Sequence, residues 1–307
     1  MLIQRSSIDV VVRAPAKLNL FFEVLAKRND GYHEIETLVC PIDLYDTLYF
    51  RKELGGQVNL QCDRVPESGR CNGRASDDAW VVPLPAAREN IALRAAELLR
   101  RQAGVDCGAA LRLVKRIPIA AGLGGGSSDA AAALVAANEA WNLRRSPSEL
   151  AATASELGSD VPFFLVGGPA VCRGRGERVE PVVGLGGLHF VVAYPPAGLS
   201  TAAVYAACRP AREPRPLGPL LECLLRGDMA QAGRLLFNRL QPAAEGLSPW
   251  IQRLRRQFAD EDCLGHGMSG SGTSYYGLCR HASQARRVAR RIQANGVGSV
   301  FAVRSCR

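Results

Sequence analysis

Pro118-Ile-Ala-Ala-Gly-Leu-Gly-Gly-Gly-Ser-Ser-Asp-Ala-Ala-Ala-Ala-Leu134 carries four glycines directly before an alanine-rich run that predicts a helix. Glycine lets the backbone approach an anion closely and adopt left-handed dihedrals, and a helix start adds N–H donors and positive potential. Ser127 or Ser128 is the expected N-cap. The simpler alternative is a flexible glycine turn before a buried helix, but four glycines and two hydroxyls exceed what a cap requires. The segment therefore predicts a phosphate site.

The glycine segment differs from the two commonest nucleotide motifs. No Lys follows the glycines, as the Walker pattern GxxxxGK[ST] requires, and no ribose-binding acid follows an ordered GxGxxG about 20 residues further on. A P-loop NTPase and a dinucleotide dehydrogenase are both disfavoured. The spacing predicts phosphate binding and names no reaction.

The length and composition indicate a globular protein of two domains. A chain of 307 residues exceeds the usual size of one compact core, so we expect two domains that share a cleft. Charges or Pro interrupt the apolar runs before they could span a bilayer, and the first 13 residues do not resemble a signal peptide. Ten cysteines without a CxxC pair favour reduced thiols over a zinc site or disulfides. We expect a cytoplasmic protein with no membrane partner.

The net charge of +9 suits either nucleic acid or small anionic ligands. Arg286, Arg287, Arg290 and Arg291 recur at helical spacing, but no aromatic side chains are interleaved with them. A solvated helix face explains this pattern better than a nucleic-acid surface. We therefore predict a small-molecule substrate and no nucleic-acid partner.

A β-hairpin is predicted at the start of the chain. Residues 10–25 alternate as a strand, Asn29-Asp30-Gly31 is a strong turn signal, and residues 35–40 return as the partner strand. The alternation divides the first strand into two faces, with Leu18, Leu20, Phe22 and Val24 on one and Asn19, Phe21 and Glu23 on the other. Residues 62–85 then shift to Gly, Ser, Asp, Arg and Pro, which predicts a surface excursion without core residues.

Further elements follow from periodicity and capping signals. The first group is a helix over 87–101 closed by Gly104, a strand over 111–119, and a helix that begins after the cap Ser146 and ends near Gly158. Strands are expected at 163–166 and 188–194, and a Pro-rich connector at 210–219 leads into a mostly helical stretch. The chain closes with a strand that ends at Cys279, a helix over 283–295 and a strand over 299–304.

Three segments together resemble the motifs of the GHMP kinases. The glycine segment resembles the second motif, Pro15-Ala-Lys-Leu-Asn-Leu20 resembles the first, and Gly267-Met-Ser-Gly-Ser-Gly-Thr273 resembles the third, in the family's order. The resemblance implies an α+β fold with an N-terminal domain like ribosomal protein S5, over 1–171, and a ferredoxin-like α/β domain over 172–307. It places a cleft between them, with the last strand able to pack on the first domain.

Two more segments narrow the resemblance to one branch of these kinases. Arg28-Asn-Asp-Gly-Tyr-His-Glu34 and Leu157-Gly-Ser-Asp-Val-Pro-Phe-Phe164 are similar to the branch that phosphorylates the 2-hydroxyl of a cytidine diphosphate-linked methylerythritol, on the route to isoprenoid precursors. Asp30-Gly31-Tyr32-His33 argues against the homoserine kinases of the same family. A non-catalytic sensor or RNA-binding module on the same fold is a further alternative, but it predicts degraded catalytic positions.

The resemblance implies that Lys17 and Asp160 are the catalytic pair. Phosphoryl transfer needs a carboxylate that accepts the hydroxyl proton and a cation that tempers the developing charge. A carboxylate beside a lysine ammonium is expected to stay ionised. Taken alone, Asp160 is equally well a helix cap or turn acid, and Lys17 is better explained as a surface lysine.

The resemblance also implies the ATP site and its metal. Asn90, Lys115 and Pro118 lie at positions that the family uses near the nucleotide, and the phosphates are expected on Gly122, Gly124, Gly125, Gly126, Ser127 and Ser128. Mg²⁺ should bridge phosphate oxygens, with Ser127 or Ser128 as the protein contact. Asp129 is an alternative metal contact but serves equally well as a helix cap.

For the acceptor substrate, the resemblance indicates a second group of residues. Tyr32 and Tyr205 are expected to stack on the two faces of the cytosine, and His33 to read the edge of the base. Ordinary packing or turn positions are the alternatives for these three. The remaining expected contacts are Asn19, Asp160, Gly270, Ser271 and Gly272. We expect a monomer or a weak homodimer.

Overall fold

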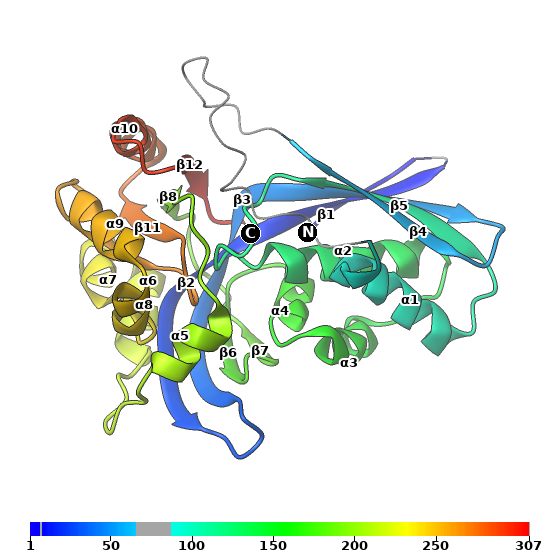
Figure 1. Ribbon diagram of the computed structural model, residues 1–307, viewed down its shortest axis with the longest axis horizontal. Helices are drawn as coiled ribbons and strands as arrows, with labels where there is room; N and C mark the ends of the chain where they lie inside the picture. The colour runs from blue at the N-terminus through cyan, green and yellow to red at the C-terminus, as the bar shows by residue number, and fades with distance from the viewer. Residues whose placement is uncertain (7, 66–86, 307) are drawn as a thin grey trace.

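Two β-sheets and ten α-helices make up the described residues of this computed structural model, which are 1–6, 8–65 and 87–306. The strands of the first sheet are β1 (Leu2–Arg5), β2 (Asp9–Lys27), β3 (His33–Glu53), β4 (Val58–Arg64), β5 (Gly108–Lys115), β6 (Ala170–Gly174), β7 (Arg178–Pro181) and β9 (Phe237–Asn238). Those of the second are β8 (His189–Tyr194), β10 (Gly265–Met268), β11 (Tyr275–Cys279) and β12 (Ser299–Arg304). Figure 1 shows the sheets as neighbours, each with its own helices.

The predicted hairpin of β2 and β3 is confirmed, and both strands are longer than expected. They run antiparallel from Asp9 paired with Arg51 to Lys27 paired with His33. The predicted division of β2 into faces does not separate buried from exposed side chains. Leu18, Phe21 and Glu23 are all buried, because β2 is covered on both sides in this part of the fold. The pairing register also shifts between Asn19 and Phe21.

Four helices cover one face of the first sheet, as Figure 1 shows: α1 (Ile91–Ala103), α2 (Gly125–Ala140), α3 (Pro147–Leu157) and α4 (Val161–Val166). Helix α2 is buried almost all round, and its residues from Ala130 to Leu134 have no exposed surface. Alanine has the highest helix propensity and allows close approach of neighbouring elements. The alanine-rich sequence therefore produces a central helix whose body is enclosed by neighbouring elements.

Capping signals predicted the start of α3 and the end of α1 correctly and the start of α2 wrongly. Ser146 and Glu149 form the capping box of α3, and Gly104 ends α1 with a φ of 62°. Ser127 and Ser128 do not cap α2, which begins at Gly125 after the left-handed Gly124. The glycines already supply the turn, so both serines lie within the first helical turn.

Three predicted boundaries need correction. Residues 163–166 belong to helix α4 and not to a strand, because a short apolar run fits a buried strand or helix equally well. The strand predicted over 111–119 ends at Lys115, since the chain turns through Pro118 and through Ala120, whose φ is 55°. The 3-10 turn Ala87–Glu89 precedes α1, so that helix starts at Ile91.

The excursion predicted over 62–85 is wrong at its beginning. Strand β4 continues to Arg64 and pairs in parallel with β5. Residues 66–86, which include most of this segment and Cys71, lie outside the described residues.

The second sheet is antiparallel, in the order β10-β11-β8-β12. The predicted strand, helix and strand at the C-terminus are confirmed as β11, α10 (Ala282–Ala294) and β12. The predicted helical stretch is also present, as α6 (Gly218–Arg226), α7 (Met229–Leu235), α8 (Gln241–Leu247) and α9 (Pro249–Ala259), with α5 (Thr201–Ala207) before the connector. On the charged face of α10, Arg287 and Arg291 pair with Asp262 and Glu261.

The two parts of the chain are joined at several points. The predicted domain boundary between residues 171 and 172 falls inside β6, which pairs with β3 of the first sheet. At the chain end, Ser305 bridges to Ile42, and the backbone of Arg304 donates to Asp43 at 2.8 Å. The division into 1–171 and 172–307 stays a prediction. None of the helices in the described part of the chain has the length and apolar character needed to span a bilayer.

One buried ion pair attaches the second part of the chain to β2. The carboxylate of Glu23 accepts Nε and Nη2 of Arg239 at 2.7 and 2.9 Å. The backbone N–H groups of Val24 and Arg215 also donate to it, each at 2.9 Å. Burial by itself raises the pKa of Glu23, but these hydrogen bonds outweigh burial and hold the pKa below its ordinary value of 4.5.

Glu23→Gln is expected to lower the free energy of unfolding by about 2 kcal/mol at neutral pH, because hydrogen bonds to a buried carboxylate are lost. Since folding lowers the pKa of Glu23, the carboxylate stabilises fully above its unfolded pKa, and this contribution is lost as the pH falls through the folded pKa. The difference between variant and wild type should therefore shrink in acid.

Urea unfolding at neutral pH and at successively lower pH measures this difference. The matched control is Glu180→Gln, which removes an exposed ion pair with Arg173 and should cost less than about 0.5 kcal/mol. An effect of Glu23→Gln that does not change with pH would contradict the assignment.

Candidate active site

A cavity of about 990 Å³ lies where the glycine segment, the β2–β3 hairpin, α5 and the loop after β10 meet. This volume is at the upper end for ligand pockets and has room for two substrates. The cavity brings together nearly all of the predicted site residues: Lys17, Tyr32, His33, Asn90, Lys115, Pro118, Gly122, Gly124, Gly125, Gly126, Ser127, Asp160, Tyr205, Gly270, Ser271 and Gly272. Two predicted residues, Asn19 and Ser128, do not line it.

The glycine segment forms an open cradle at the start of α2. Gly122 and Gly124 have φ values of 74° and 69°, in the left-handed region. A Cβ atom at Gly124 would lie 2.9 Å from both Lys17 Cγ and Phe164 Cζ. No side chain caps the helix N-terminus. The first N–H groups of α2 are therefore available, and the cradle fits a phosphate group.

Two serines follow the glycines, and they differ in position. Ser127 lines the cavity. Ser128 is completely buried, and its Oγ has no hydrogen-bond partner among the described residues. Ser127 is therefore the hydroxyl that can reach a phosphate or its metal.

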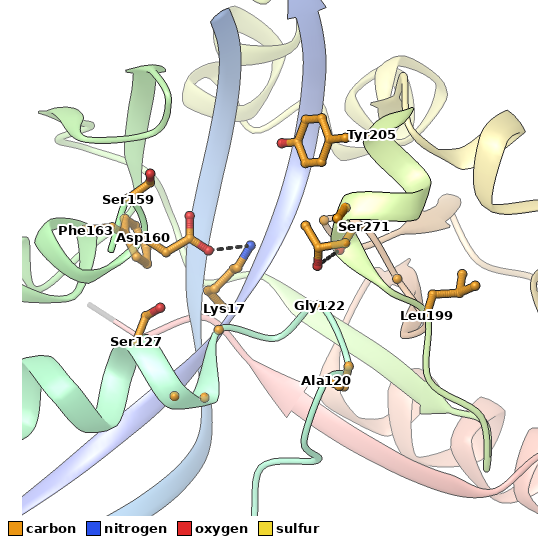
Figure 2. A pocket seen from close by; sticks show the side chains of 18 of the residues that line it. Lys17, Ala120, Gly122, Ser127, Ser159, Asp160, Phe163, Leu199, Tyr205 and Ser271 are labelled. Atoms are coloured by element: carbon orange, nitrogen blue, oxygen red, sulfur yellow. Dashed lines mark hydrogen bonds and ion pairs between the residues drawn. The ribbon is translucent and has the colours of Figure 1, made fainter. Parts of the chain in front are cut away.

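Lys17 and Asp160 point toward one another across the cavity, as Figure 2 shows. Lys17 Nζ lies 3.6 Å from Asp160 Oδ2, and the two side chains are 6% and 49% exposed. Asp160 occupies the N-cap position of α4, yet its side chain makes no capping hydrogen bond. The carboxylate of Asp160 is therefore free to face a ligand. The burial of Lys17 shows that it is not an ordinary surface lysine.

Asn19 does not line the cavity but holds Lys17 through a buried hydrogen bond. Its Oδ1 accepts from Lys17 Nζ at 2.5 Å, and its Nδ2 donates to Thr37 Oγ1 at 2.9 Å. Thr37 in turn donates to the carbonyl of Phe21 at 2.6 Å. This chain of hydrogen bonds fixes the ammonium between Asn19 and Asp160.

Three of the predicted acceptor residues, Tyr32, His33 and Tyr205, line the cavity with aromatic side chains. The rings of His33 and Tyr205 lie 5.0 Å apart at an angle of 31°. Tyr32 is 53% exposed, and the guanidinium of Arg175 lies 4.8 Å from its ring centre. Burial, with a smaller effect of Lys27, lowers the pKa of His33, so its imidazole is neutral at physiological pH. A neutral imidazole can both donate to and accept from a base edge.

The loop of Gly270, Ser271 and Gly272 closes the cavity on the side of α5. Ser271 Oγ forms a hydrogen bond of 2.8 Å with Thr201 Oγ1 at the start of α5. Figure 2 shows Ser271 and Tyr205 on the side of the cavity opposite Ser127 and Asp160. The loop and α5 thus form one wall.

Lys115 lines the cavity, but its ammonium is committed to two carboxylates. Its Nζ donates to Asp129 at 2.5 Å and also to Asp46, and all three side chains are buried. Burial opposes the charge of Lys115, while Asp129 and Asp46 together raise its pKa. No pattern in the sequence indicates Asp46, which meets Lys115 only in the folded chain. Asp129 faces Lys115 and does not cap α2.

Ser269 and Arg175 are two further residues that sequence analysis missed. Ser269 Oγ donates to the Gly122 carbonyl at 3.0 Å and accepts from the Asn19 N–H at 3.3 Å. It therefore joins both glycine loops to β2. The third glycine motif indicated this loop. Nothing in its local sequence shows that Ser269 bonds to the other glycine loop while Ser271 lines the cavity.

The fit of a Mg²⁺ ion rests on few protein donors. Among the described residues, no group of three or more His, Cys, Asp or Glu side chains could hold a metal. Ser127 supplies a hydroxyl at the cavity, beside a cradle for phosphate. Mg²⁺ commonly binds through phosphate oxygens and water with one or two protein groups, so the site suits a metal delivered with a nucleotide.

Comparisons with known proteins identify the family of this chain. The model of the GHMP kinases N terminal domain matches residues 90–168, and that of the GHMP kinases C terminal domain matches residues 220–298. The chain is 42% identical over 286 residues to 4-diphosphocytidyl-2-C-methyl-D-erythritol kinase of Pelotomaculum thermopropionicum, covering 92% of this chain and 94% of that protein. It is 39% identical to the enzyme of the same name from Mycolicibacterium gilvum, covering 94% and 88%.

Solved structures of the same family have a similar fold. A crystal structure of 4-(cytidine 5'-diphospho)-2C-methyl-D-erythritol kinase superposes with a TM-score of 0.80 at 36% identity, covering 97% of this chain and 99% of the other. Homoserine kinase from Cytophaga hutchinsonii superposes with a TM-score of 0.72 at 20% identity, covering 99% and 96%. The second similarity concerns the fold alone.

Proposed function

The chain belongs to the 4-diphosphocytidyl-2-C-methyl-D-erythritol kinases of the GHMP family, and from this premise we propose that it transfers the γ-phosphoryl group of ATP to the 2-hydroxyl of 4-diphosphocytidyl-2-C-methyl-D-erythritol. The protein is thus a phosphotransferase with an alcohol acceptor, on the methylerythritol phosphate route to isoprenoid precursors. The observation that carries the proposal is the pairing of Lys17 and Asp160 at 3.6 Å beside an uncapped helix start.

Asp160 is the proposed general base. As the acceptor oxygen attacks the γ-phosphorus, the bond from that phosphorus to the β-phosphate oxygen breaks, and the hydroxyl proton passes to the Asp160 carboxylate. Lys17, held by Asn19, stabilises the negative charge that spreads over the transferring group. The role of Lys17 needs a position that is fixed before the reaction, and the buried hydrogen bonds around Lys17 provide it.

The donor phosphates are proposed to lie on the cradle of Gly122 to Gly126. The N–H groups at the start of α2 would hold and orient them, and the helix dipole adds to their effect. Mg²⁺, when bound, neutralises charge on the phosphates, and Ser127 is the side chain placed to contact it. Asn90 and Pro118 also line the cavity and are the proposed neighbours of the nucleoside.

The acceptor is proposed to bind with its base among Tyr32, His33 and Tyr205. Aromatic faces stack on any nucleobase, and a neutral His33 can read the edge of cytosine. Tyr205 lies against His33, so a base that stacks on Tyr205 must enter beside this pair. Cytoplasmic localisation and a monomeric or weakly dimeric state stay proposals.

A coupled assay of ADP release tests the function. The purified chain should release ADP with 4-diphosphocytidyl-2-C-methyl-D-erythritol, and its kcat/KM for homoserine or mevalonate should be lower by about a thousandfold or more, since neither fills the nucleotide-binding end of the cavity. Equal turnover of homoserine would overturn the choice of acceptor. RNA retention without ATP turnover would instead favour a non-catalytic module.

A further inference from the structure

Strand β9 is only two residues long, yet it lies beside the catalytic strand. Phe237 and Asn238 pair in parallel with Phe21 and Phe22 of β2, a few residues after Lys17. The backbone N–H of Arg239 donates to the Phe22 carbonyl at 2.8 Å. The buried pair of Glu23 and Arg239 and the contact of the Phe21 and Phe237 rings at 5.8 Å hold the strand there. The position of Asn238 relative to Lys17 is therefore set by several contacts.

Both N–H donors and the carbonyl oxygen of the Asn238 side chain are hydrogen-bonded. Its Nδ2 donates to the carbonyls of Met268 and Gly270, each at 2.8 Å, and its Oδ1 accepts from the Leu240 N–H at 2.9 Å. The side chain is buried, with 7% exposure. Two acceptors on one side and a donor on the other allow only one orientation of the amide. Asn238 thus holds two carbonyls of the third glycine loop at once.

The Gly270 peptide lies against the catalytic machinery. A Cβ atom at Gly270 would be 3.3 Å from Asn19 Oδ1 and 3.5 Å from Lys17 Nζ. Gly270 has a φ of 55°, and because it lacks a Cβ atom its backbone has access to the conformations that a rotation of the peptide requires. A carbonyl that rotated toward the cavity would compete for the Lys17 ammonium and oppose a phosphate. The hydrogen bond from Asn238 keeps this carbonyl in the interior.

We infer that Asn238 is a positioning residue for phosphoryl transfer, which holds the loop of Met268 to Gly272 so that Lys17 stays directed at the reacting groups. The expected effect of Asn238 on kcat rests on the proposed function. Its role in holding the loop rests on the hydrogen bonds alone. Asn238 does not line the cavity and acts only through the loop.

Asn238→Asp tests this role, because it keeps the size of the side chain and replaces its two N–H donors by an acceptor. We expect kcat to fall by about tenfold or more and the Kd for a non-hydrolysable ATP analogue to stay within about threefold, since the start of α2 is unchanged. Hydrogen exchange of the amides in residues 268–274 should accelerate by about tenfold.

The matched control is Asn138→Asp. Asn138 holds the loop before α3 in the same way, with Nδ2 donating to the Arg145 carbonyl at 3.1 Å and Oδ1 accepting from its N–H at 3.0 Å, away from the cavity. It should leave kcat and the exchange of residues 268–274 unchanged. If Asn238→Asp does not fold, Asn238→Ser is used instead. Its single hydroxyl donor should give a loss of kcat that is smaller than the loss expected for Asn238→Asp.

The kinetic and the hydrogen-exchange measurements test the inference and the proposed function separately. Wild-type protein that fails to phosphorylate the cytidyl acceptor overturns the proposed function, and the exchange measurement still decides whether Asn238 holds the loop. Unchanged exchange in the Asn238 variants overturns the holding role. If the wild type is active and the kcat of these variants stays within about twofold of it, the positioning role is overturned. The loss of a buried hydrogen bond at this loop should lower kcat by more than that.

Discussion

Asp160→Asn is expected to lower kcat by about a thousandfold, because the amide keeps the shape of the carboxylate and cannot accept the hydroxyl proton. Binding of a non-hydrolysable ATP analogue should stay within about threefold, since the phosphate cradle does not include this side chain. Steady-state kinetics with the cytidyl acceptor and a titration with the analogue measure both quantities.

A control for this variant is Asp262→Asn. The Asp262 side chain is also 49% exposed and also forms an ion pair, with Arg287, but it lies away from the cavity. Its removal should leave kcat unchanged. Full activity of Asp160→Asn would remove Asp160 from the role of base and leave Lys17 with the glycine cradle as the catalytic groups.

Local signals in the sequence predicted most of the fold. The capping box of Ser146, the glycine end of α1 and the turn at Gly31 are features of a few consecutive residues, and each is confirmed. The serine cap on α2 was wrong because the left-handed Gly124 already forms the turn, so the helix begins two residues before the serines. The strand over 163–166 was wrong because the burial of Phe163 and Phe164 reveals an apolar segment but not its period.

The site was predictable where one segment supplies both the residue and its context. The glycine segment placed Gly122 to Ser127 at the cavity in this way. Asp46, Asn238 and Ser269 were missed because each depends on a partner that is far away in the sequence. Asp46 bonds to Lys115, Asn238 to Gly270 and Ser269 to Gly122. None of these pairs leaves a periodic or local signal.

These missed residues share one physical task. The proposed catalytic lysine on β2 and the proposed phosphate cradle before α2 must keep a fixed separation, because a displacement of about 1 Å can cost a hundredfold in rate. Lys17 donates its backbone N–H to Leu123 at 2.9 Å, and Ser274 donates to Ala121 at 3.0 Å. Together with Ser269, these bonds make β2 and both glycine loops one rigid unit.

Gly122→Ala should disrupt this unit more than any other glycine substitution at the cradle. A Cβ atom at Gly122 would lie 2.3 Å from the Ser269 carbonyl oxygen and 2.9 Å from that of Gly272, and both are backbone atoms that cannot rotate away. The φ of 74° adds a left-handed strain for alanine. The two glycine loops must therefore separate.

We expect Gly122→Ala to lower the free energy of unfolding by about 3 kcal/mol and kcat/KM by about a hundredfold, measured by urea unfolding and by the ADP-release assay. Gly104→Ala is the matched control, because its φ of 62° imposes the same backbone strain and nothing lies within 4 Å of the added Cβ. It should cost about 1 kcal/mol and leave the kinetics unchanged. If Gly122→Ala behaved like Gly104→Ala, strain alone would explain it, and the close contact of the two loops would have no part in holding the catalytic geometry.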